Sequence, residues 1–114
     1  TVYGDGSNWR PFIHVRDAAR AYLDAALDPG AWPQRVYNVG SNDGNYRISE
    51  IAEIVREELD RDLDVTYLED EQPGPSYHVN FDRLAETGFE TEWTLREGIR
   101  DIASELTGTE ATQA

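Results

Sequence analysis

Apolar side chains recur every three or four residues in three stretches of the chain, and this spacing is typical of amphipathic helices. The first predicted helix begins around Arg16 and is stopped by the turn-forming residues 28–30. The second is expected to take Ser49 as its N-cap. Their apolar positions are Ala18, Ala19, Tyr22, Leu23, Ala26 and Leu27 in the first helix, and Ile51, Ile54, Val55 and Leu59 in the second.

The third predicted helix has the clearest start signal. Thr94 and Glu97 have the spacing of a capping box, in which the Thr hydroxyl accepts from the Glu amide and the Glu carboxylate accepts from the Thr amide. The apolar stripe of this helix consists of Leu95, Ile99, Ile102 and Leu106. Gly108 is expected to end it, and residues 109–114 are expected to form a flexible tail.

Short runs rich in β-branched and aromatic residues predict strands between the helices. These runs are residues 11–15, 35–39, 65–68 and 77–80. A further short strand and a turn are expected in the first ten residues, whereas residues 40–45 have the composition of a loop. Residues 82–87 predict one or two helical turns that end at Gly88.

The order of these elements predicts an α/β fold with few, short strands. Three or four isolated short strands make a poor sheet, so we expect this unit to rest on a larger partner domain. One of its faces should then be more apolar than the surface of an ordinary monomer. Parts of Tyr3, Trp9, Phe12 and Trp32 are expected on that face.

The composition describes one acidic domain. Its 114 residues include 23 acidic and 10 basic side chains, for a formal net charge of −13. Nucleic acid and anionic membranes would be repelled by this charge, so neither is an expected partner. No apolar run approaches the roughly 20 residues of a membrane-spanning helix. Without Cys, no disulfide or thiolate metal site can form.

The missing residue types change this picture. All basic residues are Arg, and the chain contains neither Lys nor Met. A chain that begins at Thr1 without Met is expected to be a fragment or an isolated domain of a longer protein. The acid-rich, Lys-free composition fits a high-GC genome or a halophilic host, in which a dense carboxylate surface keeps proteins soluble. We favour the halophilic interpretation, and both stay open.

Few residues have a specific chemical signal. Gly4-x-Gly6 lacks the third Gly of a dinucleotide fingerprint, because Trp9 stands in its place, so it is interpreted as a plain turn. His14 and His78 are the only imidazoles and lack metal-site spacing, so no metal site is expected. His14 is instead interpreted as a packed, hydrogen-bonded histidine. The acids are too numerous for any pair to stand out as an acid–base couple.

Arg10 differs from the other basic residues. It lies between a turn-forming loop and an apolar run, beside Trp9 and Pro11. An Arg held at the start of a strand next to loops suits bidentate capture of a phosphate. An ordinary surface Arg is the alternative interpretation.

Four stretches of the sequence, in the same order, resemble one known family. The stretch YGDGSNWRPFIHVRDAARA (residues 3–21) resembles the pattern Y-G-x-G-x-x-x-R-D, followed by an aromatic residue, an aliphatic residue and H-V-x-D-x-A-x-A. VYNVG (residues 36–40) resembles the family's next strand, and residues 48–55 its following helix. GF (residues 88–89) and WTLREGI (residues 93–99) resemble its closing helix. Over nearly all its length, the chain is similar to the C-terminal part of the NAD-dependent epimerase/dehydratase family, the extended short-chain dehydrogenases/reductases.

This resemblance implies a small α/β substrate-binding subdomain, residues 1–108, that lacks the family's Rossmann domain. In the family, the Rossmann domain binds NAD or NADP and contains a Tyr-x-x-x-Lys pair for proton and hydride chemistry. A chain without Lys cannot contain that pair, so neither catalytic residues nor a cofactor are expected here. The implied parent is a cytoplasmic NAD(P)-dependent nucleotide-sugar epimerase or dehydratase. Its Rossmann domain would be a partner of this part, and homodimers are common in the family.

The resemblance also implies which residues bind the substrate. In the family, the Arg at the position of Arg10 contacts the diphosphate. The aromatic residue at the position of Tyr3 often lies against the base. An Asn most like Asn45 often reaches the diphosphate or the nucleoside.

Three departures from the family pattern leave alternatives open. Pro11 replaces the usual Asp, Arg16 stands where an acid is common, and Pro75 stands where a second phosphate-binding Arg is frequent. Tyr77 and His78 are the expected substitutes for that second Arg. Otherwise the substrate carries less phosphate, as for a reductase of a non-nucleotide carbonyl compound. A non-enzymatic interaction module is the alternative from a different class.

Overall fold

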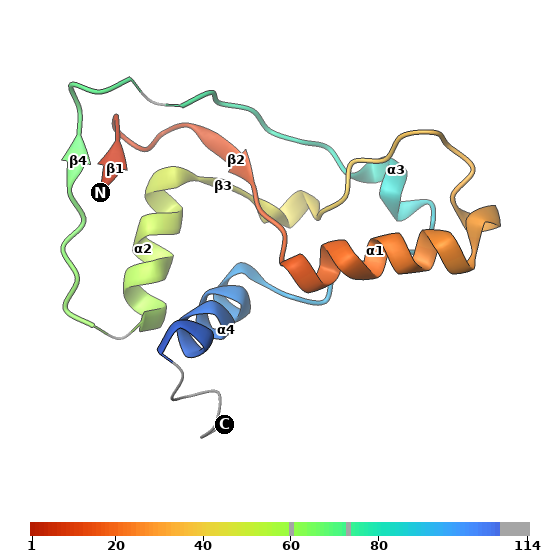
Figure 1. The fold of residues 1–114 in the computed structure, drawn as a ribbon. Coiled ribbons are helices and arrows are strands. Elements are labelled where there is room, and N and C mark those ends of the chain that lie inside the picture. Colours follow the sequence, from red (N-terminus) through yellow and green to blue (C-terminus); the bar gives the residue numbers. More distant parts are fainter. Residues whose placement is uncertain (60, 73, 108–114) are drawn as a thin grey trace.

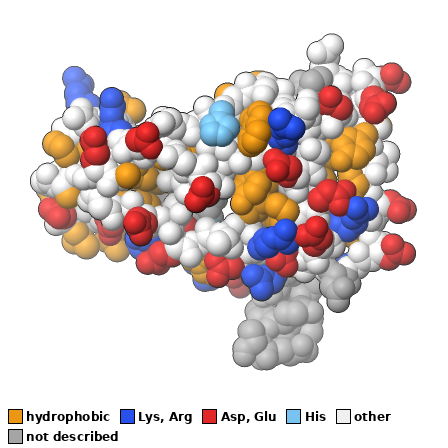
Figure 2. Space-filling model, turned by 180° about the vertical axis from the view of Figure 1, so that it is seen from behind, with side chains coloured by type: hydrophobic (Ala, Val, Ile, Leu, Met, Phe, Trp, Pro, Cys, Tyr) orange, Lys and Arg blue, Asp and Glu red, His pale blue; other side chains and the backbone are white. Residues whose placement is uncertain are grey.

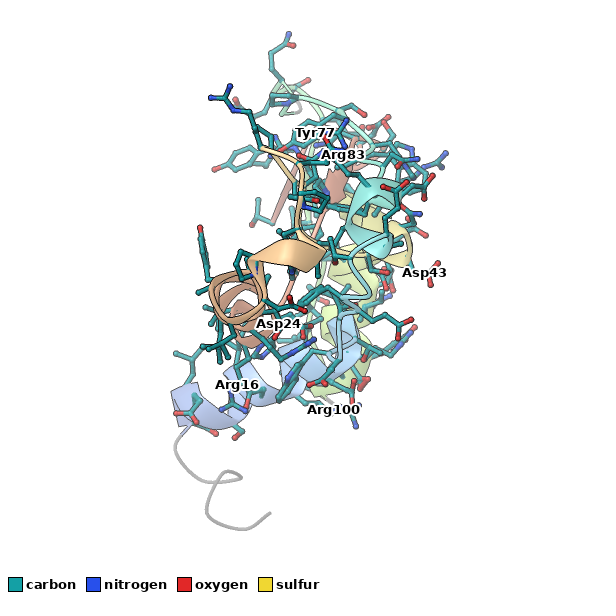
Figure 3. The ribbon with its side chains drawn as sticks, turned by 90° about the vertical axis from the view of Figure 1, so that its right-hand side faces the viewer. Arg16, Asp24, Asp43, Tyr77, Arg83 and Arg100 are labelled. Carbon is teal, nitrogen blue, oxygen red and sulfur yellow. The ribbon has the colours of Figure 1, made fainter. Side chains whose placement is uncertain are left out.

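The protein forms a thin slab. The computed structural model describes residues 1–59, 61–72 and 74–107 (Figure 1). Its principal extents are 48 × 39 × 16 Å and its Cα radius of gyration is 16.6 Å, whereas a compact domain of this length has a radius of gyration of about 13 Å. A helix with its side chains is about 10–12 Å across, so a slab 16 Å thick is little more than one layer. Figure 3 shows this slab from its edge.

The three predicted long helices are present. They are α1 (Val15–Leu27), α2 (Ile48–Leu59) and α4 (Leu95–Thr107). The shorter helical elements are α3 (Asp82–Ala85) and two 3₁₀ turns, η1 (Pro29–Ala31) and η2 (Asn42–Gly44). After α1 the chain turns at residues 28–30, as predicted, and Gly88 follows α3 with a φ of 85°. None of the helices that the structure describes is long and apolar enough to cross a bilayer.

The helix starts show one correct and one wrong prediction. The capping box of α4 is confirmed: the Thr94 amide donates to Glu97 Oε1 at 2.9 Å, and the Glu97 amide donates to Thr94 Oγ1 at 3.2 Å. Ser49 is not the N-cap of α2, because it lies inside that helix. Glu50 accepts from the Arg47 amide at 2.7 Å instead, and α2 begins at Ile48, two residues before the first helical residue that a Ser49 N-cap would give. The predicted end at Gly108 and the tail at 109–114 lie outside the described residues.

The strands form two separate pairs. β1 (Val2–Tyr3) runs parallel to β4 (Tyr67–Leu68), and β2 (Trp9–Pro11) runs antiparallel to β3 (Asn45–Arg47). In the second pair, Trp9 lies opposite Arg47, and Arg10 lies opposite Tyr46.

Several strand predictions were wrong. Residues 35–39 and 77–80 form no strand, and the strand expected at 11–15 lies at Trp9–Pro11. Conversely, β3 begins at Asn45, where a loop was expected. β-rich composition is a local property, whereas a strand also needs a paired neighbour, which only the tertiary fold supplies.

The predicted apolar face of α1 is exposed. Val15, Tyr22, Leu23 and Leu27 have exposed fractions of 75%, 82%, 56% and 75%, while Asp17 and Ala21 are the buried residues of this helix. Figure 2 shows exposed apolar side chains among charged ones on the face turned away from the view of Figure 1. Contiguous exposed apolar surface is rare on a monomer, so α1 has the character of a helix that another layer covers.

A small core lies where α1 meets α3 and the segment before α4. Ala21, Leu84 and Phe89 form it. Trp32 belongs to this core and not to an exposed face, since its ring is 5.1 Å from Tyr37 and 5.9 Å from Phe89 between centroids. Trp9 is likewise half-buried. Tyr3 and Phe12 are exposed, at 60% and 37%, as the prediction of an apolar face required.

Candidate functional site

Arg10 lies in the middle of β2, against a segment far away in the sequence. Its Nε donates to the Pro75 carbonyl oxygen at 2.7 Å, and its guanidinium carbon is 5.1 Å from the Tyr77 ring centroid. We call residues 74–77 the strap. The structure thus brings together two of the five predicted site residues, Arg10 and Tyr77.

The strap follows the outer edge of β2. The Trp9 amide donates to Ser76 Oγ at 3.0 Å, and the Tyr77 amide donates to the Trp9 carbonyl at 3.0 Å. The other edge of β2 is occupied by β3. In Figure 1, this part of the chain runs above β2 on its way from β4 to α3.

His78 lies beside Trp9. Their rings meet edge to face, with centroids 5.2 Å apart, and the Arg47 guanidinium is 5.0 Å from the Trp9 ring. Since Trp9 and Arg47 are opposite residues of one strand pair, their side chains share a face of the ribbon. Arg47 is therefore a cation near the predicted site that sequence reasoning missed. Arg47 is placed there by β3, a strand that was not predicted, because its first residue, Asn45, was expected to belong to a loop.

Asn45 connects two parts of the fold. It is 8% exposed, and its Nδ2 donates to the carbonyl oxygens of Asn42 and Val79 at 3.1 and 2.9 Å. Its Oδ1 accepts from the Val79 amide at 2.9 Å. Both amide hydrogens of Asn45 are thus used within the protein. Contact between Asn45 and a substrate stays a prediction.

Tyr3 lies on a different strand pair from Arg10. It is opposite Leu68 in the β1–β4 pair, and its ring is available for stacking because 60% of the residue is exposed. The turn between β1 and β2 is ordered by Asp5, which accepts from the hydroxyl and the amide of Ser7 at 2.6 and 3.0 Å. These hydrogen bonds, that of the Ser7 hydroxyl first, lower the pKa of the Asp5 carboxyl.

Asn8 is a second residue that the sequence did not single out. It is 7% exposed, and its Oδ1 is buried without a hydrogen-bond donor among the described residues. An Asn among turn formers gives no sequence signal of burial. Asn8 lies two residues before Arg10, and its Nδ2 and Arg10 Nη2 would lie 3.9 and 2.6 Å from a Cβ on residue 74, so this uncommon buried acceptor belongs to a side chain near the guanidinium.

The positive charges of Arg10 and Arg47 are not neutralised by nearby carboxylates among the described residues. Neither forms an ion pair with a carboxylate in the part of the chain that the structure describes, whereas Arg16, Arg20 and Arg96 each have a carboxylate within 4.0 Å. In a chain with a net charge of −13, two unpaired guanidinium groups around the strap make a local positive potential. Such a site is suited to an anion.

His14 belongs to a different region, a groove of about 490 Å³ between the start of α1 and α4. Its Nε2 is 3.1 Å from Asp101 Oδ2, its Nδ1 accepts from the Arg16 amide at 3.0 Å, and its ring stacks on Trp93 with centroids 4.0 Å apart. The prediction of a packed, hydrogen-bonded histidine is confirmed. None of the five predicted site residues lines this groove. No cluster of three or more potential metal ligands occurs in residues 1–59, 61–72 and 74–107.

Comparison with known proteins finds similarity to one family. The sequence model of the NAD dependent epimerase/dehydratase family matches residues 1–40. The low-salt glycan biosynthesis protein Agl12 of Haloferax volcanii is 30% identical over 99 residues, which are 86% of this chain and 31% of that protein. The chain is similar to members of the NAD-dependent epimerase/dehydratase family over most of its length.

Solved structures agree with this assignment. The dTDP-glucose 4,6-dehydratase of Bacillus anthracis, in complex with NAD, superposes with a TM-score of 0.70 and 27% identity over 96% of this chain and 35% of its own. The UDP-N-acetylglucosamine 4-epimerase of Methanobrevibacter ruminantium, in complex with UDP-N-acetylmuramic acid, gives a TM-score of 0.66 and 27% identity over 91% of this chain and 34% of its own. The α/β fold expected for part of an epimerase/dehydratase is therefore confirmed. The chain spans about a third of the length of these family members.

The turn at Gly4 and Gly6 does not have the geometry of a dinucleotide fingerprint. Gly4 and Gly6, both with a φ of 73°, lie in a turn that leads into strand β2. A dinucleotide fingerprint would lead into a helix whose N-terminus faces the pyrophosphate. Gly6 packs against the start of α2, where its carbonyl accepts from the Ser49 amide at 2.8 Å. These two glycines thus connect secondary-structure elements within the fold.

Proposed function

We propose that this chain is the substrate-binding part of an NAD(P)-dependent nucleotide-sugar epimerase or dehydratase. The observation that carries the proposal is Arg10, a guanidinium in β2 that has no carboxylate partner among the described residues and lies 5.1 Å from the centroid of the Tyr77 ring. In an acidic chain, such a group favours a diphosphate over a neutral ligand. The epimerase and the dehydratase that it resembles act on nucleotide sugars, which supports this substrate class.

Under this proposal the residues around the strap bind different parts of the substrate. Arg10 holds the diphosphate, and Tyr3 offers an exposed ring for the base. Tyr77 and His78, which lie beside Arg10 and Trp9, replace the second Arg of the family pattern. Asn45 contributes by holding β3 to residue 79, with one acceptor lone pair left for the ligand.

The chemistry itself belongs to the rest of the protein. NAD or NADP, bound by a Rossmann domain of the parent, would supply hydride transfer. We further propose that this Rossmann domain covers the exposed apolar face of α1, where Tyr22, Leu23 and Leu27 are more than half exposed. A cytoplasmic location and a homodimeric parent complete the proposal.

Calorimetry on the protein expressed from its complete reading frame tests the diphosphate site. We expect UDP, dTDP or GDP to bind, and Arg10→Ala to weaken the binding about tenfold to a hundredfold, because a charge-assisted hydrogen bond contributes about 1.5–3 kcal/mol. Arg35→Ala is the matched control, since it removes the same charge from the loop between η1 and η2.

Two results would contradict the proposal. If none of the three nucleotides binds, the substrate is not a nucleotide sugar, and the reductase of a non-nucleotide carbonyl compound becomes the better interpretation. If binding is unchanged in Arg10→Ala, the diphosphate lies elsewhere.

A further inference from the structure

The strap occupies Arg10 much as a ligand would. The Pro75 carbonyl oxygen accepts from Nε, and the Tyr77 ring lies against the guanidinium. An oxygen acceptor and a flat ring are also what a nucleotide brings to an Arg. A Cβ on residue 74 would lie 2.6 Å from Arg10 Nη2, so a side chain at this position would require the end of the Arg10 side chain to shift.

Few contacts hold the strap in place. Besides the Arg10–Pro75 hydrogen bond, two described hydrogen bonds join the strap to β2: the Trp9 amide donates to Ser76 Oγ, and the Trp9 carbonyl accepts from the Tyr77 amide. Pro11, the next residue whose backbone nitrogen faces that edge, has no N–H and cannot extend the pairing. All four residues of the strap are exposed. A segment with exposed hydrogen bonds and little buried surface opens at low free-energy cost.

Beneath the strap lies an acceptor without a donor. Asn8 Nδ2 would be 3.9 Å from a Cβ on residue 74, which places this side chain next to both the strap and Arg10. Asn8 Oδ1 is buried and receives no hydrogen bond from the described residues. A buried acceptor of this kind is costly unless some state of the protein supplies a donor.

We propose that the strap competes with the ligand for Arg10, and that Asn8 Oδ1 accepts a hydrogen bond from the ligand once the strap is displaced. This inference rests on the proposed function, because it concerns the ligand of Arg10, and displacement of the strap frees the Tyr77 ring from Arg10 so that the ring can contact the ligand. It requires a ligand with an anionic oxygen and, beside it, an N–H or O–H donor. UDP has both groups, whereas inorganic sulfate, fully ionised at neutral pH, has only acceptors.

The first test weakens the strap in the full-length protein. Ser76→Ala removes the acceptor of the Trp9 amide, so the open state becomes more populated. We expect the dissociation constants for UDP and sulfate to fall about two- to tenfold, since apparent affinity scales with the competent fraction. Ser76→Thr keeps the hydroxyl and should bind like the unsubstituted protein. Ser104→Ala, on α4, is the matched control. Unchanged or weaker binding by Ser76→Ala overturns the competition.

The second test distinguishes the contribution of Asn8 to ligand binding from that of Arg10. Asn8→Ala should weaken the binding of UDP and leave that of sulfate unchanged. If both probes lose affinity equally, or neither does, Asn8 does not accept from the ligand.

A third measurement needs no substitution. The Tyr77 amide donates to the Trp9 carbonyl, so its hydrogen exchange reports on the closed strap. We expect UDP to accelerate this exchange, whereas slower or unchanged exchange would mean that the strap stays closed over the ligand and would overturn the proposal. If Arg10→Ala abolishes binding while Ser76→Ala changes nothing, the diphosphate site stands and the strap does not compete. If Arg10→Ala has no effect, both proposals fail.

Discussion

Asp17 joins two distant parts of the chain through one buried carboxylate. With 1% exposure, it accepts from the amides of Glu92 and Trp93 at 2.9 and 3.0 Å and from Arg20 Nη2 at 3.2 Å. These bonds hold the segment before α4 against α1. The carboxylate therefore determines where the capped start of α4 lies.

Asp17→Ala should lower the free energy of unfolding by about 3 kcal/mol, because it leaves two backbone donors and a guanidinium without their acceptor. Urea unfolding measures this value. Asp24→Ala is the matched control: Asp24 is 44% exposed and 3.9 Å from the same Arg20, and its loss should cost less than about 1 kcal/mol. Equal effects of the two substitutions would contradict the structural role of Asp17.

Gly6 is the second position where a single residue determines the packing. Its φ is 73°, and a Cβ there would lie 2.9 Å from the backbone nitrogen of Ser49. Gly6→Ala should thus cost roughly 3 kcal/mol, combining backbone strain with overpacking. Gly88→Ala should cost only about 1 kcal/mol, because Gly88 has a φ of 85° but nothing within 4 Å. Thermal unfolding of both variants checks this difference, and a milder effect at Gly6 would disprove the contact.

At the scale of elements, the start of α4 depends on pH. The Thr94 amide first, and then its hydroxyl, lower the pKa of the Glu97 carboxyl from its ordinary value of 4.5. A lowered pKa in the folded state means that the ionised Glu97 stabilises the protein above about pH 4.5, and that this contribution is lost as the pH falls through the folded-state value.

Glu97→Gln isolates this effect, since Gln keeps an acceptor for the Thr94 amide and removes the charge. The stability difference between the unsubstituted protein and Glu97→Gln should be constant near neutral pH and shrink towards zero below about pH 4. Urea titrations at several pH values measure it. A difference that grows on acidification would reverse the sign and refute the interpretation.

Helices and strands were not equally predictable. The periodicities of α1, α2 and α4 were sufficient because each helix satisfies its own backbone. The strands were predicted less well: β1 and β4 lie within predicted strands, but Asn45 was expected in a loop and begins β3, while the β-rich residues 35–39 have no partner. Within the candidate site, Arg10 could be singled out from its sequence neighbours. Asn8 and the strap could not, because their contacts span 65 residues or more of the chain.

At the scale of the whole molecule, charge and shape are the dominant features. A slab 16 Å thick with a net charge of −13 has strong self-repulsion and little core to oppose it. Salt shortens the Debye length from about 10 Å at 0.1 M to about 3 Å at 1 M, so it weakens this repulsion.

We expect the midpoint of urea unfolding to rise steadily between 0.1 M and 2 M KCl, as it would for a protein of a halophilic host. The same series in sucrose, which stabilises folded states without screening charge, is the control. If KCl leaves the midpoint unchanged or lowers it, self-repulsion does not limit stability, and the composition is better explained by genome base content.

The sequence by itself determined the three long helices, the acidic character and the resemblance to the epimerase/dehydratase family, because helical periodicity, net charge and short motifs are all local properties. Tertiary structure decided the rest. It placed the apolar face of α1 on the outside, since none of the described residues covers Tyr22, Leu23 and Leu27. It also brought Arg10, Asn8 and the strap together, because their pairing depends on where the chain returns after more than sixty residues.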